Sequence, residues 1–406
     1  MNCTVTIPFD EPVNDMAREE ILKQVPQLSA SLKRPRISPD GSRLEFQVPA
    51  DQADNTRQHA QRLCGLIQRS LQRVERKVVY TTRAMSQPVA LWESDDMSPQ
   101  NVGIRPVACG QVMLEGIALQ LFRFFDTALA RLEREWAPHE LLTPTLIPSR
   151  VLAKCDYFAS FPNSLTFACH LQPDVEVINA FRVRHDHKPA VDAEALAEMA
   201  PPECCLSPAV CYHVYHCLEN VTLPAEGVIY SVRGKCFRYE GTNLRAMTRL
   251  WDFTMRELVF VGPGEIVLEQ RQQCVERVGA FLDELGLAAE VRTASDPFFI
   301  APEAPSKSYF QLTAETKYEI SALLSDKQRL AVGSLNYHTD FFGRAFNIHL
   351  EGMGYGHSVC TAFGLERLVW AFLARHGGEP EEWPRELRTA VLSAPLETIQ
   401  ESSRPS

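Results

Sequence analysis

The sequence predicts an α+β protein built around a large, mainly antiparallel sheet with helices on its flanks. Between about residues 138 and 375, short strand-like and helical segments follow one another, and a longer helix from about Glu265 to Leu285 interrupts them. This order is typical of mixed α+β folds and differs from the regular alternation of parallel α/β folds. The 406 residues are 45% hydrophobic and 23% charged, which indicates a globular chain with a sizeable core.

The first 82 residues follow a pattern of their own, for which we predict a small accessory domain. Its elements are, in order, a strand at 3–9, a helix from Asn14, hairpin strands at 34–37 and 43–48, a helix capped by Asn55, and a strand at 77–81. Pro39-Asp40-Gly41 supplies the turn of the hairpin. The βαββαβ order predicts a ferredoxin-like domain.

The second helix of this domain carries four arginines, which are spaced by seven, four and three residues. They are Arg62, Arg69, Arg73 and Arg76. These spacings place them on roughly one face of the helix. Such a face could contact tRNA or an acidic carrier protein, and an ordinary solvated helix face has the same pattern.

The rest of the chain divides into a linker, a catalytic domain and a tail. Residues 83–110 contain three prolines and no clear periodicity, which predicts a linker. A long amphipathic helix is expected from Gln111 to about Trp136, and it opens a domain that we place at 111–394. Residues 395–406 are expected to form a disordered tail.

Composition weighs against a membrane protein and against a dedicated nucleic-acid binder. No apolar run approaches the roughly 18 residues of a membrane helix. The N-terminal residues lack the features of a signal peptide, so a cytoplasmic location is expected. The net charge is −10 and the pI about 5.6, whereas binding to phosphates needs clustered Lys and Arg.

The chain contains twelve cysteines, for which a cytoplasmic location predicts free thiols or metal ligands rather than disulfides. The densest group is Cys204, Cys205, Cys211 and Cys217, and it contains no CxxC pair. Spacing by itself favours small buried side chains for this group. A strand is predicted across residues 209–215.

A nucleotide would have to bind through side chains on the sheet, because no glycine-rich phosphate loop is present in the sequence. Arg238 and Glu240 are two residues apart on a predicted strand and therefore face the same side. Arginine can bind a phosphate oxygen with two N–H groups, and the carboxylate can orient an amino acid or an adenine amine. Phe253, on the returning strand, offers a flat surface for a base.

Two further motifs supply candidate contacts. Arg367 lies in the first turn of a helix that follows Gly364, where it can hold a terminal phosphate with the help of the helix N-terminus. The turn at 334–343 is dense in polar and aromatic residues, which suggests substrate contacts through Asn336, Tyr337 and Asp340. Taken alone, each of these motifs is also common at ordinary strand, helix and turn positions.

Together the three segments resemble motifs 2 and 3 of class II aminoacyl-tRNA synthetases, which bind ATP on an antiparallel sheet with one Arg from each motif. Over residues 110–375 the chain more closely resembles the amino acid:carrier protein ligases, relatives of the zinc-dependent seryl-tRNA synthetases of methanogens. The segments that carry this resemblance are 156–162, 206–212, 255–257, 295–299, 317–319, 336–343 and 360–367.

The resemblance implies one zinc ion held by Cys211, Glu257 and Cys360. Cys155 is a weaker substitute for Cys211, since it lies much further from motif 2. Three protein ligands leave a fourth tetrahedral position open, as in reactive zinc sites. By resemblance, the α-amino group of the substrate fills that position. Without the resemblance, both cysteines would be interpreted as buried thiols.

The resemblance also implies the reaction. The carboxylate of a small amino acid attacks the α-phosphate of ATP, Arg238 neutralises the charge that develops there, and Arg367 holds the γ-phosphate. Mg²⁺ is expected to bind through Glu351 or a nearby acid. Crowding by Phe158, Tyr337 and Phe341 suggests a small side chain on the substrate.

The acceptor of the aminoacyl group divides the hypotheses. In the carrier protein ligases it is a phosphopantetheine thiol, which we expect here, and in the synthetases it is a tRNA hydroxyl. A non-catalytic synthetase paralogue is the third alternative. The class II relatives dimerise through the motif 1 region, here about residues 111–148, so a homodimer is expected.

Overall fold

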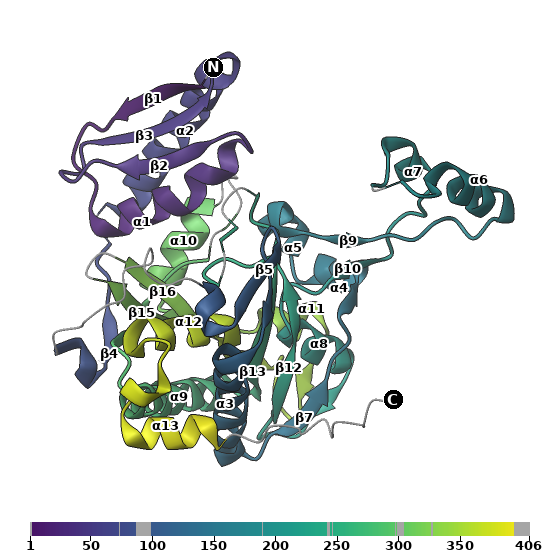
Figure 1. Cartoon of the computed structure of the whole chain (residues 1–406). Coiled ribbons are helices and arrows are strands. Elements are labelled where there is room, and N and C mark those ends of the chain that lie inside the picture. The colour runs from purple at the N-terminus through teal and green to yellow at the C-terminus, as the bar shows by residue number, and fades with distance from the viewer. Residues whose placement is uncertain are drawn as a thin grey trace, which may run out of the picture.

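A computed structural model describes most of the chain, and its centre is one eight-stranded sheet (Figure 1). The described residues are 2–72, 74–86, 99–188, 190–241, 244–245, 247–296, 298, 304–325 and 328–393. The strand order is β4-β14-β15-β16-β18-β13-β12-β7, and all neighbours are antiparallel except β12 and β7. The predicted α+β class with a mainly antiparallel sheet is confirmed.

The strands of this sheet come from distant parts of the chain. Their bounds are β4 (Val78–Thr81), β7 (His139–Leu142), β12 (Val228–Phe237), β13 (Asp252–Gly262), β14 (Ala289–Thr293), β15 (Lys317–Ser325), β16 (Gln328–Tyr337) and β18 (His357–Gly364). Smaller sheets pair β5 (Ile104–Ala108) with β6 (Gln111–Leu114), β10 (Cys204–Leu206) with β8 (Leu146–Pro148) and β9 (Phe167–Ala168), and β11 (Thr222–Leu223) with β17 (His349–Leu350).

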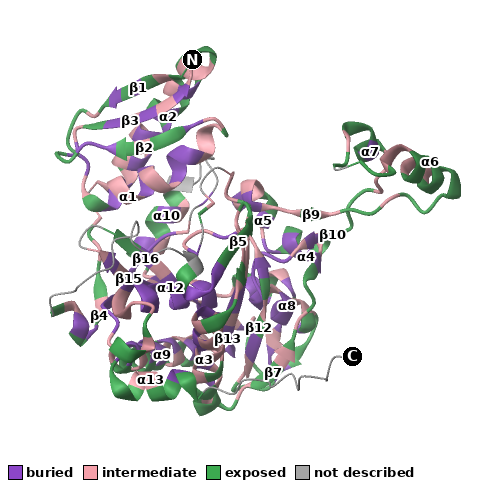
Figure 2. Ribbon diagram, in the orientation of Figure 1, coloured by how far each residue is buried: buried purple, intermediate pink, exposed green. Residues whose placement is uncertain are grey.

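Helices cover both faces of the large sheet. One face carries α3 (Gly116–Glu133), α9 (Gly264–Glu284), α12 (Leu365–His376) and α13 (Arg385–Leu392). The other carries α4 (Ser149–Lys154), α5 (Tyr157–Ser160), α8 (Cys211–Cys217) and α11 (Phe341–Ala345). Figure 2 shows that the buried residues concentrate where these helices meet the sheet.

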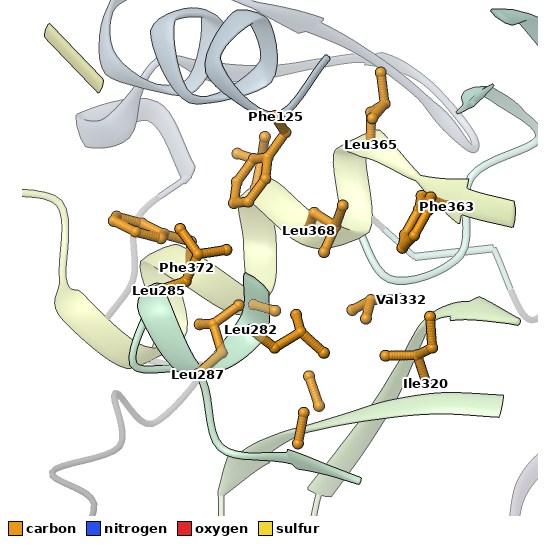
Figure 3. Close-up of a cluster of buried hydrophobic side chains, with 14 of the residues drawn as sticks. Phe125, Leu282, Leu285, Leu287, Ile320, Val332, Phe363, Leu365, Leu368 and Phe372 are labelled. Carbon is orange, nitrogen blue, oxygen red and sulfur yellow. The ribbon is translucent and has the colours of Figure 1, made fainter. Parts of the chain in front are cut away.

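The first of these faces packs the main hydrophobic core. Figure 3 shows Phe125 of α3, Leu368 and Phe372 of α12, and the strand residues Ile320 and Val332 gathered in one cluster. All five side chains are buried, and Phe125 and Phe372 meet edge to face with ring centroids 6.1 Å apart. This cluster is therefore apolar, while elsewhere on the same face Arg256 of β13 forms ion pairs with Asp126 and Glu133 of α3.

Alternation along β13 separates the two faces. Leu258 and Phe260 point into the main core, whereas Met255 and Val259 belong to the core on the opposite face. Because successive strand residues point to opposite sides, Glu257 lies on the same side as Met255 and Val259. We call this side the site face.

The N-terminal residues form a three-stranded sheet in the order β1-β3-β2, covered by two helices. The elements are β1 (Asn2–Pro8), α1 (Asp15–Gln24), β2 (Lys33–Ile37), β3 (Arg43–Pro49) and α2 (Ala53–Leu71). Asn14 caps α1 as predicted, and its side chain accepts a hydrogen bond from the Ala17 N–H. The cap predicted at Asn55 is wrong, since α2 begins two residues earlier.

The prediction that the last strand of the βαββαβ unit belongs to the N-terminal sheet is wrong. This strand, β4, pairs with β14 of the large sheet. Its position is fixed by Tyr80, whose ring lies so close to Gly279 of α9 that a Cβ there would sit 2.4 Å from it. The Tyr80 hydroxyl also donates to Asp283 at 2.8 Å. The accessory sheet therefore has three strands, and the fourth is built into the catalytic sheet.

Three local predictions also differ from the structure. The end of the predicted linker forms the β5–β6 hairpin, with Ile104 fully buried in the main core. The predicted long helix begins only at Gly116, after strand β6. Residues 211–217 form helix α8 rather than a strand. Residues 87–98 of the predicted linker and the predicted tail from 395 lie outside the described residues.

Two helices stand away from the body of the molecule. Helices α6 (Val175–His185) and α7 (Ala193–Ala197) project beyond β9 and β10 (Figure 1), and α6 buries none of its residues. A further helix, α10 (Ala304–Thr313), packs against α2, and its Leu312 joins the N-terminal core. Of the helices described, none has the length and apolar character needed to cross a membrane.

Candidate active site

The three predicted metal ligands meet on the site face. Cys211 begins α8, Glu257 lies in β13 and Cys360 in β18. Strand register pairs Val259 with Cys360, which brings Cys360 next to Glu257 on the same face. The two sulfurs and a carboxylate oxygen lie within 4.8 Å of one another, and all three residues are buried. Cys155, the weaker candidate, is buried in the same core but outside this group.

Glu257 is a buried carboxylate in need of a partner. Neither of its oxygens has a hydrogen-bond partner. Burial is the main cause that raises the pKa of Glu257 to about 8, and the neighbouring Cys360 adds to it. Such a group is costly to keep charged in a protein interior without a counter-ion. Two thiols and one carboxylate are ligands that suit zinc, so the residues present fit that ion.

Cys360 is surrounded by groups that stabilise a thiolate. The Asn336 side-chain N–H donates to its sulfur at 3.5 Å, and Nε2 of His338 lies 3.8 Å from it. The other ring nitrogen of His338 lies 3.3 Å from the Tyr215 hydroxyl and 3.1 Å from that of Ser358. Two hydroxyls on Nδ1 favour the tautomer that carries its proton on Nε2, toward the sulfur. The sequence motif contained His338, but no role was predicted for it.

The two thiols lie close enough to affect each other's ionisation. A hydrogen bond between Cys211 and Cys360 is the leading cause that raises the pKa of Cys211 and lowers the pKa of Cys360. A cation bound between them would remove this competition, because both sulfurs bind metals as thiolates.

The two predicted phosphate-binding arginines also come together. Arg238 follows β12, donates through Nε to the Pro208 carbonyl at 2.9 Å, and lies 5.6 Å above the ring of Phe253. Arg367 lies in the first turn of α12 and donates to the Ala331 carbonyl at 3.0 Å. Nη2 of Arg238 lies 3.7 Å from the Met255 sulfur, Met255 pairs with Gly364 across the strands, and the Arg367 side chain lies against Gly364, so the two side chains occupy one region. Burial is the main cause that lowers the pKa of Arg367, and the charge of Arg238 adds to it.

Glu240 lies in this region as an ion pair with Arg249. Both residues act on the pKa of Arg367 after burial, Glu240 raising it and Arg249 lowering it. Arg249 was not among the predicted residues. It lies in the loop between β12 and β13, where no strand or helix period marks its position.

Two of the predicted substrate contacts are placed differently. Tyr337 follows Asn336 in β16 and so points to the opposite face, where its hydroxyl meets Nδ1 of His357 at 2.7 Å. The structure thus places Tyr337 on the face opposite the metal-ligand candidates. Asp340 precedes α11 and pairs with Nε of Arg344 at 2.6 Å, so its carboxylate already has a partner. Asn336 lies beside Cys360 on the site face, and substrate contact by these three residues stays a prediction.

Glu351, the predicted Mg²⁺ ligand, lies in an exposed turn after β17. Its backbone N–H donates to the Leu223 carbonyl, and no contact joins the described Glu351 to either Arg238 or Arg367. The structure thus gives Glu351 no place among the nucleotide contacts.

The aromatic residues that crowd the metal ligands also differ from those predicted. Phe158 and Phe341 are exposed at 37% and 42%. Tyr212 instead lies between Tyr157 and Phe342, with ring centroids 5.9 and 5.8 Å away.

The comparisons with known proteins agree with this geometry. The family model of the tRNA synthetase class II core domain (G, H, P, S and T) matches residues 203–376, which include both arginines and all three metal-ligand candidates. The structure of M. kandleri SerRS in complex with A. aeolicus tRNASec matches with a TM-score of 0.68, at 20% identity, over 96% of this chain and 77% of that chain. The fold is that of a class II synthetase core.

Relatives that are similar in sequence indicate which family of class II proteins the chain belongs to. Amino acid–[acyl-carrier-protein] ligase 1 of Bradyrhizobium diazoefficiens is 34% identical over 263 residues, which cover 64% of this chain and 78% of the relative. Ligase 2 of the same organism is 31% identical, over 60% and 72%. The type-2 serine–tRNA ligase of Methanopyrus kandleri is 26% identical, over 64% and 52%. The chain belongs to the amino acid–[acyl-carrier-protein] ligase family and is an ATP-dependent amino acid ligase.

Proposed function

We propose that this enzyme activates a small amino acid as its adenylate and transfers the aminoacyl group to the phosphopantetheine thiol of a carrier protein. The observation that carries the proposal is the meeting of Cys211, Glu257 and Cys360 on the site face, next to the strand ends at Met255 and Gly364 where Arg238 and Arg367 lie. The names of the Bradyrhizobium relatives support a carrier protein as the acceptor.

Cys211, Glu257 and Cys360 would hold zinc. When bound, zinc supplies a Lewis-acidic position that a free α-amino group can occupy, because three protein ligands leave one tetrahedral position open. Asn336 and His338 hold the Cys360 sulfur in place through N–H donors.

Arg238 and Arg367 stabilise the negative charge on the phosphates during adenylate formation. A substrate carboxylate oxygen forms a bond to the α-phosphorus of ATP, and the bond to the leaving pyrophosphate breaks. In this scheme Arg238 neutralises the charge on the α-phosphate, and Arg367 holds the γ-phosphate. In the second step the acceptor thiol loses its proton, its sulfur attacks the acyl carbon, and AMP leaves. Mg²⁺ accompanies ATP in this scheme.

The buried aromatic wall of Tyr157, Tyr212 and Phe342 supports a small substrate side chain. We further propose a homodimer formed through the region around residues 111–148, in which Leu142 at the sheet edge is 88% exposed. A cytoplasmic location is part of the same proposal.

The test begins with ATP–pyrophosphate exchange measured across the standard amino acids. Exchange with small amino acids, lost after zinc is removed by a chelator and restored by added zinc, is expected. Full exchange in a metal-free preparation would contradict the zinc role. The acceptor is then tested by transfer to a phosphopantetheinylated carrier protein and to bulk tRNA.

Transfer to tRNA is the alternative, favoured by the fit to M. kandleri SerRS over nearly the whole of this chain. Acylation of bulk tRNA with no transfer to a carrier protein would replace the main proposal with this one.

A further inference from the structure

The N-terminal domain is joined to the catalytic sheet by a short segment. Helix α2 ends at Leu71, and β4 begins at Val78 and pairs with β14 at the sheet edge. The Lys77 N–H donates to the Thr293 side-chain oxygen at 3.0 Å, and the Thr293 N–H donates to the Lys77 carbonyl at 2.8 Å. Figure 1 shows the domain lying over β15, β16 and α10. Helix α1 is thereby held in one position over this end of the sheet.

A row of side chains crosses the sheet from this end toward the metal ligands. Strand register pairs Arg292 with Glu319, Glu319 with Ser334, Ser334 with Ala362, and Ala362 with Glu257. Directly paired residues point to the same face. Arg292 and Glu319 therefore lie on the site face, although neither belongs to the predicted site.

Glu319 lies at the nucleotide end of that face. Arg367 donates to the Ala331 carbonyl of β16, the strand that pairs with the Glu319 strand β15. Burial is the main cause of the lowered pKa of Arg367, and Glu319 is among the charges that act on it. Glu319 is half-buried and next to the Ser334 hydroxyl in the row. Its carboxylate is thus part of the surroundings of the arginine that we assign to the γ-phosphate.

Arg292 is shared between the two domains. Its Nη2 atom lies 3.6 Å from a carboxylate oxygen of Glu319 and also 3.6 Å from a carboxylate oxygen of Glu19 in α1. Arg292 is buried, and its Nε has no hydrogen-bond partner. Arg76 also contacts Glu19, at 2.7 Å. Glu19 therefore competes with Glu319 for one buried guanidinium group.

Glu19 is ionised wherever the protein is folded near neutral pH. Although burial raises its pKa, Lys23, Arg76 and Arg292 together hold it at about 2. The neighbouring Glu20 makes a separate contact between the domains, accepting from the Ser295 hydroxyl at 3.1 Å. Without the charge of Glu19, Arg292 would be left to pair with Glu319 alone.

We propose that Glu19 of the N-terminal domain is a positioning residue for the nucleotide end of the active site, acting through Arg292 on Glu319. By holding Arg292 midway, Glu19 keeps the Glu319 carboxylate directed toward Ser334 and Arg367. The accessory domain is then a working part of the ATP site. The inference rests on the proposed function, because it assumes that ATP binds between Arg238 and Arg367.

The experiment compares Glu19→Gln with Glu20→Gln in pyrophosphate exchange by the full chain, titrating ATP and the amino acid separately. Glu19→Gln is expected to raise the KM for ATP by about 2- to 30-fold, the range for residues that act through a network, with the KM for the amino acid unchanged. Glu20→Gln removes the charge of the neighbouring residue, whose oxygen accepts from Ser295, and is expected to leave both KM values unchanged. Glu19→Asp, which keeps the charge, is expected to restore most of the ATP affinity.

Thermal melting of each variant separates positioning from folding. Equal shifts of the KM for ATP in Glu19→Gln and Glu20→Gln, or no shift in a folded Glu19→Gln, would overturn the inference. No exchange by the unmodified enzyme with any amino acid would instead overturn the proposed function, and the inference with it.

Discussion

The two faces of the catalytic sheet are built from the same strands and have opposite characters. On the core face, Leu258 and Phe260 of β13 pack under α3 and α9 with no polar partner to satisfy. On the site face, Glu257 from the same strand is buried without any partner. Burial of Leu258 and Phe260 stabilises the fold, whereas burial of the charged Glu257 carboxylate is unfavourable unless a cation binds it. The difference teaches that a buried charge on the core face, such as that of Arg256, is paired within the protein by Asp126 and Glu133, whereas the described Glu257 carboxylate has no ion-pair partner.

The sharpest way to break this comparison is to remove one buried thiol from each face. Cys211→Ala is expected to abolish pyrophosphate exchange and bound zinc, because two protein ligands no longer hold the ion tightly. Cys274 is a buried thiol of α9 that lies in the main core. The Cys274→Ala variant is expected to keep both pyrophosphate exchange and bound zinc. Zinc content by elemental analysis and exchange rates check the pair. Equal zinc in both variants would contradict the assignment.

A substitution on the core face is expected to change the stability of the protein rather than its metal binding. Phe260→Ala is expected to lower the free energy of unfolding by about 3–5 kcal/mol, since a fully buried ring leaves a cavity. Denaturant titration measures this loss. Zinc stoichiometry in the fraction that stays folded is expected to be unchanged, and loss of zinc in a folded protein would show that the two faces are coupled.

Within the site face, the residues around Cys360 sharpen the comparison further. His338→Ala is expected to lower zinc affinity by about 10- to 100-fold, because it removes a donor to the ligand sulfur and the contact with Tyr215 and Ser358. Competition with a chromophoric chelator gives the affinity. An unchanged affinity would mean that the Asn336 N–H alone supports the sulfur.

The smallest effect is expected at Tyr337, which follows Asn336 in β16. Tyr337→Phe removes a hydroxyl on the core face that contacts His357, at a cost of about 0.5–1.5 kcal/mol of stability. Zinc affinity and the KM for the amino acid are expected to stay at the level of the unmodified enzyme. A raised KM for the amino acid would return Tyr337 to the substrate site.

Local patterns carried the predictions that the structure confirms. The alternation of apolar residues indicated the strands and the α+β class, and Asn14 marked the start of α1. Motif spacing identified Arg238 and Arg367, each next to the end of a strand. The zinc ligands were different, because no spacing rule links them and only a family resemblance singled them out.

The residues and segments that the structure places differently from the sequence analysis have local causes as well. Tyr337 was chosen together with Asn336 from one dense turn, although adjacent residues of a strand cannot share a face. Glu351 was chosen for its charge and its place near motif 3, and the chain turns outward there. Cys211 opens a helix because its segment packs against the site face, a tertiary effect that overrides the strand tendency of its valines and tyrosines.

By itself, the sequence determined the fold class, most elements of the N-terminal domain and the candidate arginines, since these depend on local period and motif, whereas the metal-ligand candidates came from a family resemblance. Only the tertiary structure decided that β4 completes the catalytic sheet and that Arg292 is shared between Glu19 and Glu319. The physical reason is that strand pairing and buried charge contacts join residues far apart in the chain. Their energy depends on which surfaces meet, and no local pattern records that.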